Sequence, residues 1–285
     1  MKIRLAANES EIDQAIDSYL INEPSVPPTE RAAILEHWVM MFKNCPEGFW
    51  IAQNEEGKIV GVATSITLPP QWILANFYVL PASHGMGIGK KLLGKAFSNA
   101  GACERFLVHA SLHPSAQSLY IQHGMYPLSY SIVFKGRPDP AALPEALTVV
   151  ERPLNEILRT LNAFDQQTLG FTRQPYHQIW AQSGHYFLVK YDDQMIGYFC
   201  VSAKRMIGPL VVSDEQWMIP ALEWAIGKQN ELSSEPHTIF VPGINKAAIK
   251  YLSARGYRLD EFISLMSSHP MPGLAQVIFH DTDLL

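Results

Sequence analysis

Val79-Leu-Pro-Ala-Ser-His-Gly-Met-Gly-Ile-Gly-Lys90 joins a strongly β-prone run, residues 72–80, to a segment with the apolar spacing of one helix face. Gly85, Gly87 and Gly89 have no Cβ, so the backbone can curl tightly and bring its N–H groups against a ligand. The first turn of the following helix adds unsatisfied N–H donors and the positive end of the helix dipole. The stretch is therefore predicted to be a strand-to-helix loop that holds an anionic group such as a pyrophosphate.

The spacing of these glycines separates the loop from other phosphate-binding loops. The dinucleotide fingerprint G-x-G-x-x-G is spaced differently, because here the glycines alternate as G-x-G-x-G. The Walker pattern G-x-x-x-x-G-K-[ST] also fails, since no Ser or Thr follows Lys90 and Lys91. Both lysines add positive charge at the rim of the loop. The alternative is a purely structural tight turn.

The length and charge of the chain restrict its class. The chain has 285 residues, which suits two domains of about 140 residues each. It carries 22 basic and 27 acidic side chains, a net charge of −5, and no Lys/Arg run of five or more. Since nucleic-acid binding depends on basic surface, nucleic acid is not expected as a main partner. No segment approaches the ~18 apolar residues of a membrane span, so no membrane association is expected.

The cysteines indicate a reducing compartment. Cys45, Cys103 and Cys200 are odd in number and far apart, and they form no CxxC or Cys/His ligand pattern. No metal site is therefore predicted, and unpaired thiols are typical of the cytosol. The N-terminal Met-Lys-Ile-Arg-Leu runs into polar residues without the apolar segment of a signal peptide. The expected location is the cytoplasm.

The hydrophobic periodicity predicts an α/β (α+β) fold. In the first half, the pattern gives strand, two helices, three strands, helix, strand, helix, strand. This order fits a mixed, mostly antiparallel sheet that turns parallel around one crossover helix. The expected segments of the first half are 2–5, 9–20, 29–42, 49–53, 59–67, 72–80, 88–97, 105–112, 115–123 and 131–134.

A similar order of strands and helices repeats in the second half. Residues 136–144, Gly-Arg-Pro-Asp-Pro-Ala-Ala-Leu-Pro, form the best candidate linker. His113 lies eleven residues before Gly124, and Asn245 lies eleven residues before Gly256, with a predicted helix in each interval. The matching element order indicates duplication. The predicted division is 1–137 for a first domain, 138–147 for a linker and 148–285 for a second domain.

Two motifs carry a family resemblance. Val79-x-Pro81 followed by His84-Gly-Met-Gly-Ile-Gly-Lys-Lys-Leu-Leu93 resembles motif A of the GCN5-related N-acetyltransferase (GNAT) superfamily. Residues 115–125, which contain Leu119-Tyr120 and Gly124-Met125, are similar to the motif that follows it in that superfamily. The match covers residues 49–134 well, and residues 1–48 fit only in element order.

The resemblance implies a cofactor site for acetyl-CoA or another acyl-CoA. It places the acyl-CoA in a cleft splayed open between the fourth and fifth strands of the first domain. The backbone near Phe77, Tyr78 and Val79 would pair with the pantetheine arm. The pyrophosphate would lie on the N–H groups of the loop, and His113 takes the place of the usual Asn of the later motif. The implied loop residues are His84, Gly85, Met86, Gly87, Ile88, Gly89 and Lys90.

The resemblance also implies the reaction. A primary amine attacks the thioester directly, with no acyl-enzyme intermediate. Tyr120, four residues before Gly124, falls on the position that commonly protonates the leaving thiolate, and a positioned phenol is suited to that task. Charge that develops on the carbonyl oxygen would be stabilised by a backbone N–H such as that of Val79. The alternative for Tyr120 is a core aromatic on a short helix.

Two further departures from the family pattern accompany that of His113. His84 stands where the superfamily usually has Arg or Gln, and residues 72–80 contain no glutamate base. His109 on the next strand would relay a proton through water or be a satisfied strand histidine. His37 and Trp38 lie on the helix that usually lines the acceptor pocket, where Trp38 could equally pack in the core.

The second half lacks the glycine loop. Residues 213–217, Ser-Asp-Glu-Gln-Trp, occupy its place, and acidic residues at a helix N-terminus would repel a pyrophosphate. Leu252 stands where the first half has Tyr120, and Tyr251 is one residue out of register, which turns it ~100° away on a helix. The second half is therefore predicted to be a degenerate GNAT-like domain that packs against the first.

The sequence thus predicts a tandem N-acetyltransferase with one working site. The acceptor would be a small-molecule amine or a peptide amine, and the protein a monomer or small homo-oligomer. One alternative is a non-catalytic acyl-CoA-binding or regulatory module. The other is a tandem acyltransferase-fold enzyme with a different donor, such as an aminoacyl-tRNA, which the weak basic character of the chain disfavours.

Overall fold

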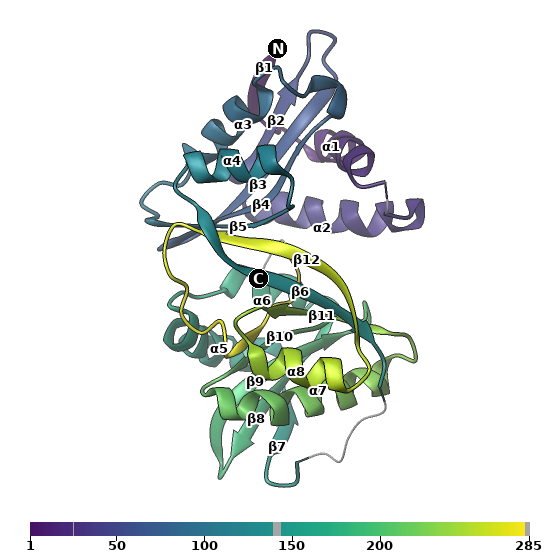
Figure 1. The fold of residues 1–285 in the computed structure, drawn as a ribbon, viewed down its shortest axis with the longest axis vertical. Coiled ribbons are helices and arrows are strands. Elements are labelled where there is room, and N and C mark those ends of the chain that lie inside the picture. Colours follow the sequence, from purple (N-terminus) through teal and green to yellow (C-terminus); the bar gives the residue numbers. More distant parts are fainter. Residues whose placement is uncertain (25, 139–143, 283–285) are drawn as a thin grey trace. The chain divides into compact units, whose positions relative to one another are not determined.

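The computed structural model describes residues 1–24, 26–138 and 144–282 (Figure 1). The chain divides into two compact units, residues 1–108 and 109–285. Each unit combines helices with a sheet whose strands are mostly antiparallel. The predicted mixed α/β class, with mostly antiparallel sheets flanked by helices, is confirmed.

The sheet of the first unit follows the predicted order of strands. Its strands lie in the order β1-β2-β3-β4-β5. The first three pairings are antiparallel, and β4 pairs with β5 in parallel, as expected for strands joined by a crossover helix. The bounds are β1 Lys2–Leu5, β2 Phe49–Gln53, β3 Ile59–Leu68, β4 Gln71–Val79 and β5 Arg105–Ala110.

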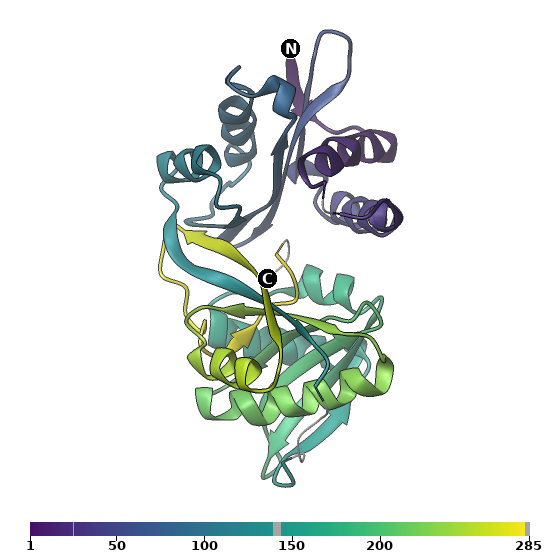
Figure 2. The ribbon, with the colours of Figure 1, turned by 45° about the vertical axis from the view of Figure 1, so that its right-hand side comes forward.

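Helices cover both faces of this sheet. Figure 2 shows α1 and α2 on one face and α3 on the other. The bounds are α1 Glu9–Asn22, α2 Arg31–Asn44 and α3 Ile88–Phe97, with short 3₁₀ turns η1 Pro28–Glu30, η2 Pro46–Gly48 and η3 Pro81–Ser83. Asn8 caps α1, because its side chain accepts a hydrogen bond from the N–H of Glu11 at 3.1 Å. Apolar residues at helical spacing, such as Ile12 and Ile16, are fully buried against the sheet.

The second unit contains two groups of antiparallel strands. One group has the order β12-β6-β11, and the other has the order β13-β10-β9-β8-β7. Single bridges, Met206 to Thr238 and Phe240 to Phe279, join β11 to the second group. The bounds are β6 Tyr126–Gly136, β7 Thr148–Glu151, β8 Gly184–Tyr191, β9 Gln194–Ser202, β10 Ile207–Val212, β11 His237–Pro242, β12 Arg258–Ser267 and β13 Val277–Ile278.

One large core holds this unit together. Helices α7 and α8 pack on the strands through fully buried residues such as Leu222, Ala248 and Leu252, which meet Val212 and Val241. Burial of this kind stabilises the fold by roughly 25 cal/mol per Å² of apolar surface. The helix bounds are α4 Pro114–Gln122, α5 Leu154–Leu169, α6 Gln174–Trp180, α7 Met218–Leu232 and α8 Lys246–Ala254, with the 3₁₀ turn η4 Glu215–Trp217.

Strand β6 belongs to the second unit by its pairing. It precedes the predicted domain boundary at residue 137, yet it lies between β11 and β12, with Val133 opposite both Phe240 and Glu261. The packing units therefore differ from the predicted sequence halves. Descent from a duplication concerns those halves and stays a prediction. Of the predicted linker 138–147, residues 139–143 lie outside the described residues.

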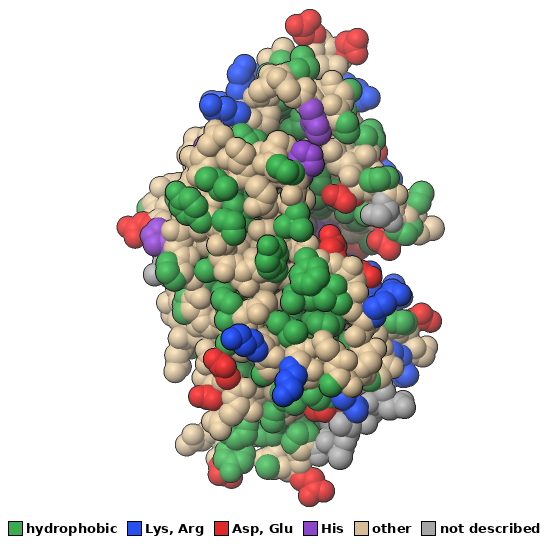
Figure 3. Space-filling model, in the orientation of Figure 1, with side chains coloured by type: hydrophobic (Ala, Val, Ile, Leu, Met, Phe, Trp, Pro, Cys, Tyr) green, Lys and Arg blue, Asp and Glu red, His purple; other side chains and the backbone are tan. Residues whose placement is uncertain are grey.

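Strands β6 and β12 also carry exposed aromatic side chains. Tyr126 and Tyr130 on β6 are 58% and 51% exposed, and Phe262 on β12 is 44% exposed. The rings of Tyr130 and Phe262 meet edge to face with centroids 6.1 Å apart. Figure 3 shows apolar side chains gathered over these two strands. The described helices include none long and apolar enough to cross a membrane.

Candidate functional site

Strand β4 positions the glycine loop. Its antiparallel register with β3 runs to Val79, which lies opposite Gly61, whereas its parallel register with β5 runs from Gln71 to Leu74. The register with β3 shifts between Leu74 and Asn76, so one extra residue bulges from β4 at the point where the β5 register ends. A bulge of this kind bends a strand and re-aims the residues that follow. The last residues of β4 therefore lead directly into the predicted loop.

The loop uses two of its three glycines for their conformation. Gly85 and Gly87 have left-handed φ values of +77° and +73°, and Gly87 is the N-cap of α3. An L-residue in this region costs about 1–2 kcal/mol. Nothing lies within 4 Å of a Cβ built on either glycine. Gly89 lies inside the first turn of α3. The positive φ values, rather than close packing, explain why positions 85 and 87 require glycine.

The surroundings of the loop favour an anion. No side chain caps the N-terminus of α3, and its first turn contains no acidic residue. Residues 57–103 contain four lysines and no Asp or Glu. Lys90 and Lys91 are exposed at the start of the helix. Unpaired N–H groups, the helix dipole and local positive charge together stabilise negative charge at this position.

His84 is bonded to the strand that precedes the loop. Its Nε2 lies 2.8 Å from the carbonyl oxygen of Val79, and the side chain is exposed. Since a carbonyl oxygen only accepts, Nε2 carries the proton. The imidazole thus links the end of β4 to the beginning of the loop, a contact that sequence reasoning did not anticipate.

The other predicted residues of this region have distinct environments. Phe77, Tyr78 and Val79 are half-buried at the end of β4. Tyr78 meets Tyr19 edge to face with ring centroids 5.1 Å apart. Ile88 is a core side chain at 3% exposure, whereas Met86 is 67% exposed. Ile88 therefore anchors α3 to the sheet, whereas the Met86 side chain is open to solvent.

Tyr120 lies on α4, and His113 directly precedes that helix, both in the second unit. Tyr120 is 4% exposed, and burial raises the pKa of its phenol well above the ordinary value, so the group stays protonated. Its carbonyl oxygen accepts the N–H of Met125 at 3.0 Å, and Gly124 closes the helix with a φ of +79°. His113 is the N-cap residue, and its Nδ1 lies 2.8 Å from the Ser115 hydroxyl. Gly124 therefore has the left-handed helix-ending role that the motif requires.

Two further candidate residues, His109 and Trp38, have contacts that belong to the core and not to a catalytic site. His109 is bonded through both ring nitrogens, Nδ1 to the Thr282 carbonyl at 3.0 Å and Nε2 to the Ser131 hydroxyl at 2.7 Å. Burial lowers its pKa to about 4, although the bond to Thr282 favours the charged form. His109 is therefore a neutral, satisfied histidine with neither nitrogen left for a relay. Trp38 is 1% exposed and packs against Phe49 in the core of the first unit.

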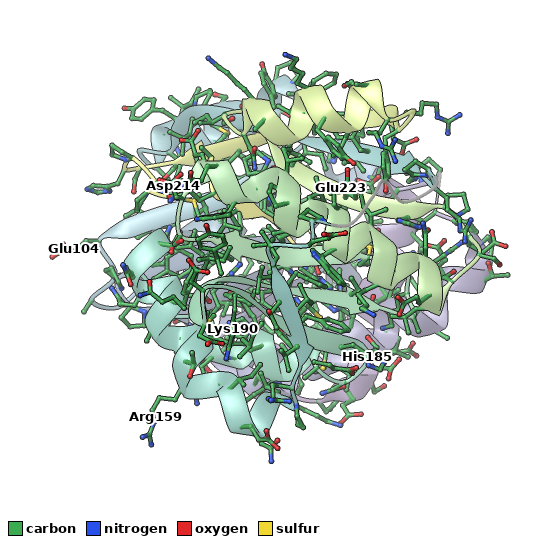
Figure 4. All side chains as sticks on the ribbon, turned by 90° about the horizontal axis from the view of Figure 1, so that it is seen from below. Glu104, Arg159, His185, Lys190, Asp214 and Glu223 are labelled. Atoms are coloured by element: carbon green, nitrogen blue, oxygen red, sulfur yellow. The ribbon has the colours of Figure 1, made fainter. Side chains whose placement is uncertain are left out.

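The counterpart segment of the second unit is acidic. Asp214 accepts a hydrogen bond from the N–H of Gln216 at 3.0 Å at the start of η4, and Glu215 follows in the first turn (Figure 4). On α8, Leu252 is fully buried, and the Tyr251 hydroxyl donates to Glu223. This connection therefore lacks both the glycines and the positive charge of the first loop.

A buried polar cluster in the second unit was missed by sequence reasoning. The carboxylate of Asp165 accepts from Arg173 at 2.9 and 3.0 Å, from His177 Nε2 at 2.9 Å and from the Tyr198 hydroxyl. His177 Nδ1 in turn lies 2.9 Å from the Tyr186 hydroxyl. The available signal was the i, i+4 spacing of Asp165 with Leu161 and Leu169, which puts a carboxylate on the buried stripe of α5.

The second unit also has a cavity of about 620 Å³ where β7 ends and α5 and β8 begin. Its wall includes Arg152 and the pair of His185 Nδ1 and Glu151, which lie 2.8 Å apart (Figure 4 labels His185). It contains none of the predicted site residues. Within residues 1–24, 26–138 and 144–282, no three His, Cys, Asp or Glu side chains are grouped so that they could hold a metal ion.

The chain is similar to known acetyltransferases in sequence and in fold. Residues 12–125 match the model of the acetyltransferase (GNAT) family. No curated protein matches the sequence significantly. An acetyltransferase-like protein of Pyrococcus horikoshii is 17% identical with a TM-score of 0.76, over 99% of this chain and 92% of that one. A GCN5-related N-acetyltransferase of Sphaerobacter thermophilus is 15% identical with a TM-score of 0.67, over 95% and 96% of the two chains.

A third solved structure has a tandem architecture. It is a tandem GNAT protein from the clavulanic acid biosynthesis pathway, 16% identical with a TM-score of 0.61, over 94% of this chain and 99% of that one. At these identities the structures establish a shared fold, and the family model covers the segment with both sequence motifs. Residues 12–125 thus form a domain of the acetyltransferase (GNAT) family, and the whole chain has the fold of tandem GNAT proteins.

Proposed function

We propose that this protein is an acyl-CoA-dependent N-acyltransferase that moves an acetyl group from acetyl-CoA to a primary amine in a ternary complex. The observation that carries the proposal is the loop between β4 and α3. Gly85 and Gly87 adopt left-handed conformations directly before an uncapped helix N-terminus. This loop lies in a segment, residues 57–103, that has lysines but no acids.

The loop suits the pyrophosphate of coenzyme A. Residues His84 to Lys90 would hold it through backbone N–H groups, since glycines let the backbone approach closely. The strand edge near Phe77, Tyr78 and Val79 would pair with the pantetheine arm, and His113 would contact the cofactor from α4. The bulge in β4 supports this arrangement, because it coincides with the end of the β5 register.

Tyr120 is proposed as the acid of the reaction. The neutral amine nitrogen bonds to the thioester carbon, and the carbon–sulfur bond breaks as the electron pair moves to sulfur. The departing thiolate takes the phenolic proton of Tyr120, and the proton released by the amine leaves to solvent. Tyr120 is then reprotonated. Burial keeps the phenol protonated, so Tyr120 holds the proton that the role requires.

The loop assignment is tested by Gly87→Glu. The variant places an anion at the pyrophosphate position and a side chain at a φ of +73°. CoA binding, measured by calorimetry, should be lost while the fold persists. Gly94→Ala is the matched control, because Gly94 lies on the same helix with open space around its Cβ position. It should bind CoA like the wild type. Unchanged CoA affinity in Gly87→Glu would remove the loop from the site.

The role of Tyr120 is tested by Tyr120→Phe. Turnover should fall by about 10²–10⁴-fold, the usual contribution of a general acid, while CoA affinity stays near wild type. A Phe variant with full activity would exclude Tyr120 as the acid. The acceptor for this assay comes from a screen of acetyl-CoA consumption over small-molecule amines, peptide N-termini and lysine side chains.

One observation favours a second candidate, a non-catalytic acyl-CoA-binding module. Strand β4 has no glutamate, and His109, the nearest alternative base in the sequence, is bonded on both nitrogens. If this candidate is correct, CoA binds, no amine in the screen is acylated, and Tyr120→Phe changes nothing. A donor such as aminoacyl-tRNA would instead appear as binding of tRNA.

We further propose a cytoplasmic location, because three free cysteines fit a reducing compartment.

A further inference from the structure

The imidazole of His84 bridges β4 and the glycine loop. The distance of 2.8 Å from Nε2 to the Val79 carbonyl oxygen is that of a good hydrogen bond. The proton on Nε2 is used in this bond to the strand end. In this pose the ring therefore organises the loop through Val79.

The bond lies between a turn that is closed by backbone hydrogen bonds and glycines that can adopt many backbone conformations. The turn is closed by its backbone, since Ser83 N–H donates to the Leu80 carbonyl at 2.8 Å and Leu80 N–H donates to the Val60 carbonyl at 2.9 Å. Immediately after His84, Gly85 adopts a left-handed conformation with open space around it. Glycine loses more conformational freedom on ordering than other residues. A side-chain bond at residue 84 therefore limits the directions in which the loop can leave the strand.

Packing does not explain the position of the ring. His84 is exposed, so loss of its side chain removes little buried apolar surface and should leave the core of the first unit intact. The effect of the bond is then confined to the relative placement of the strand end and the loop. This separates a role in ligand binding from a role in folding.

We propose that His84 is a positioning residue of the acyl-CoA site. It holds the Val79 carbonyl and thereby sets the angle between the strand edge assigned to the pantetheine arm and the loop assigned to the pyrophosphate. The inference rests on the proposed function. A site that is ordered before the ligand arrives loses less conformational entropy on binding, so the bond raises affinity without touching the ligand.

The test compares two substitutions by calorimetry with CoA. His84→Ala removes the donor and should weaken binding by about 2- to 12-fold, the range of one hydrogen bond. His84→Gln retains an N–H donor of similar reach and should bind within about twofold of wild type. Both should melt at the wild-type temperature. His185→Ala is the control, because His185 is half-exposed in the second unit, outside the predicted site.

Steady-state kinetics gives a second readout. With an amine from the screen, His84→Ala should raise KM for acetyl-CoA and leave kcat unchanged. Equal CoA affinity in His84→Ala and wild type would overturn the inference and leave the proposed function standing. Equal loss in His84→Ala and His84→Gln would show that the donor is irrelevant and would also overturn it. If the wild type itself fails to bind CoA, the proposed function falls.

Discussion

Asp165→Asn tests the buried polar cluster of the second unit. The Asp165 carboxylate and the Arg173 guanidinium are both 0% exposed and share two hydrogen bonds of 2.9 and 3.0 Å. The substitution keeps the size of the side chain but removes its charge. It also turns an amide N–H₂ toward groups that already donate to residue 165, those of Arg173, His177 and Tyr198. Arg173 thereby loses the carboxylate that balances its buried charge.

The expected loss is about 3–5 kcal/mol in the free energy of unfolding, the range for breaking one partner of a buried ion pair. The direction of the Asp165 pKa agrees with this loss. Burial alone would raise this pKa, but Arg173 and His177 outweigh burial and lower it from 3.8 to about 2. The folded protein therefore favours the charged carboxylate that the substitution removes.

The assay is urea unfolding followed by tryptophan fluorescence. The ring of Trp180 lies 5.4 Å from the Arg173 guanidinium carbon, so it reports on this cluster. Asp17→Asn is the matched control. Asp17 also bonds an arginine, Arg31, but is 65% exposed, and the cost should be below about 1 kcal/mol. A loss in Asp165→Asn no larger than the control would refute the reasoning.

The pH dependence of the same variant provides a further check. The folded pKa of Asp165 lies below the unfolded value, so its stabilisation is complete above about pH 4 and is lost as the pH falls toward 2. Asp165→Asn should therefore have a flatter stability profile than wild type over that window. A profile of unchanged slope would mean that Asp165 does not titrate with this shift.

Three other substitutions have expected outcomes that chemical or thermal unfolding checks. Asn245→Ala removes a buried cap that accepts from Ala248 N–H and donates to the Val277 carbonyl, each at 3.1 Å, and should cost about 1–3 kcal/mol; no loss would mean that the cap is replaced. Gly197→Ala would put a Cβ 2.5 Å from the Val211 carbonyl oxygen and should cost about 1–3 kcal/mol, whereas Gly94→Ala, an exposed helix position, should gain about 0.5–1 kcal/mol. His109 has a folded pKa of about 4, below its unfolded value of 6.5, so stability should fall between pH 6.5 and 4, and His109→Gln should flatten that fall; an unchanged slope would contradict the assignment.

The sequence alone was sufficient for the local elements. Nearly every predicted strand and helix of the first unit is present, because apolar periodicity and Gly or Pro punctuation act within a few residues of each other. The glycine loop was recognisable for the same reason. Its position between β4 and α3, and the left-handed Gly85 and Gly87, follow from neighbouring residues. The resemblance of residues 12–125 to the GNAT family was likewise readable from two short motifs.

The tertiary structure decided what depends on residues far apart in the chain. The pairing of β6 with β11 and β12 joins segments about a hundred residues apart, so a linker-like composition near residue 140 did not reveal it. The bonds of His109 to Ser131 and Thr282 removed a candidate base. The bond of Asp165 to Tyr198, which lies 33 residues away, likewise appears only when the chain is folded. Hydrogen bonds between side chains and distant backbone require positions that only packing supplies, and local pattern carries no record of them.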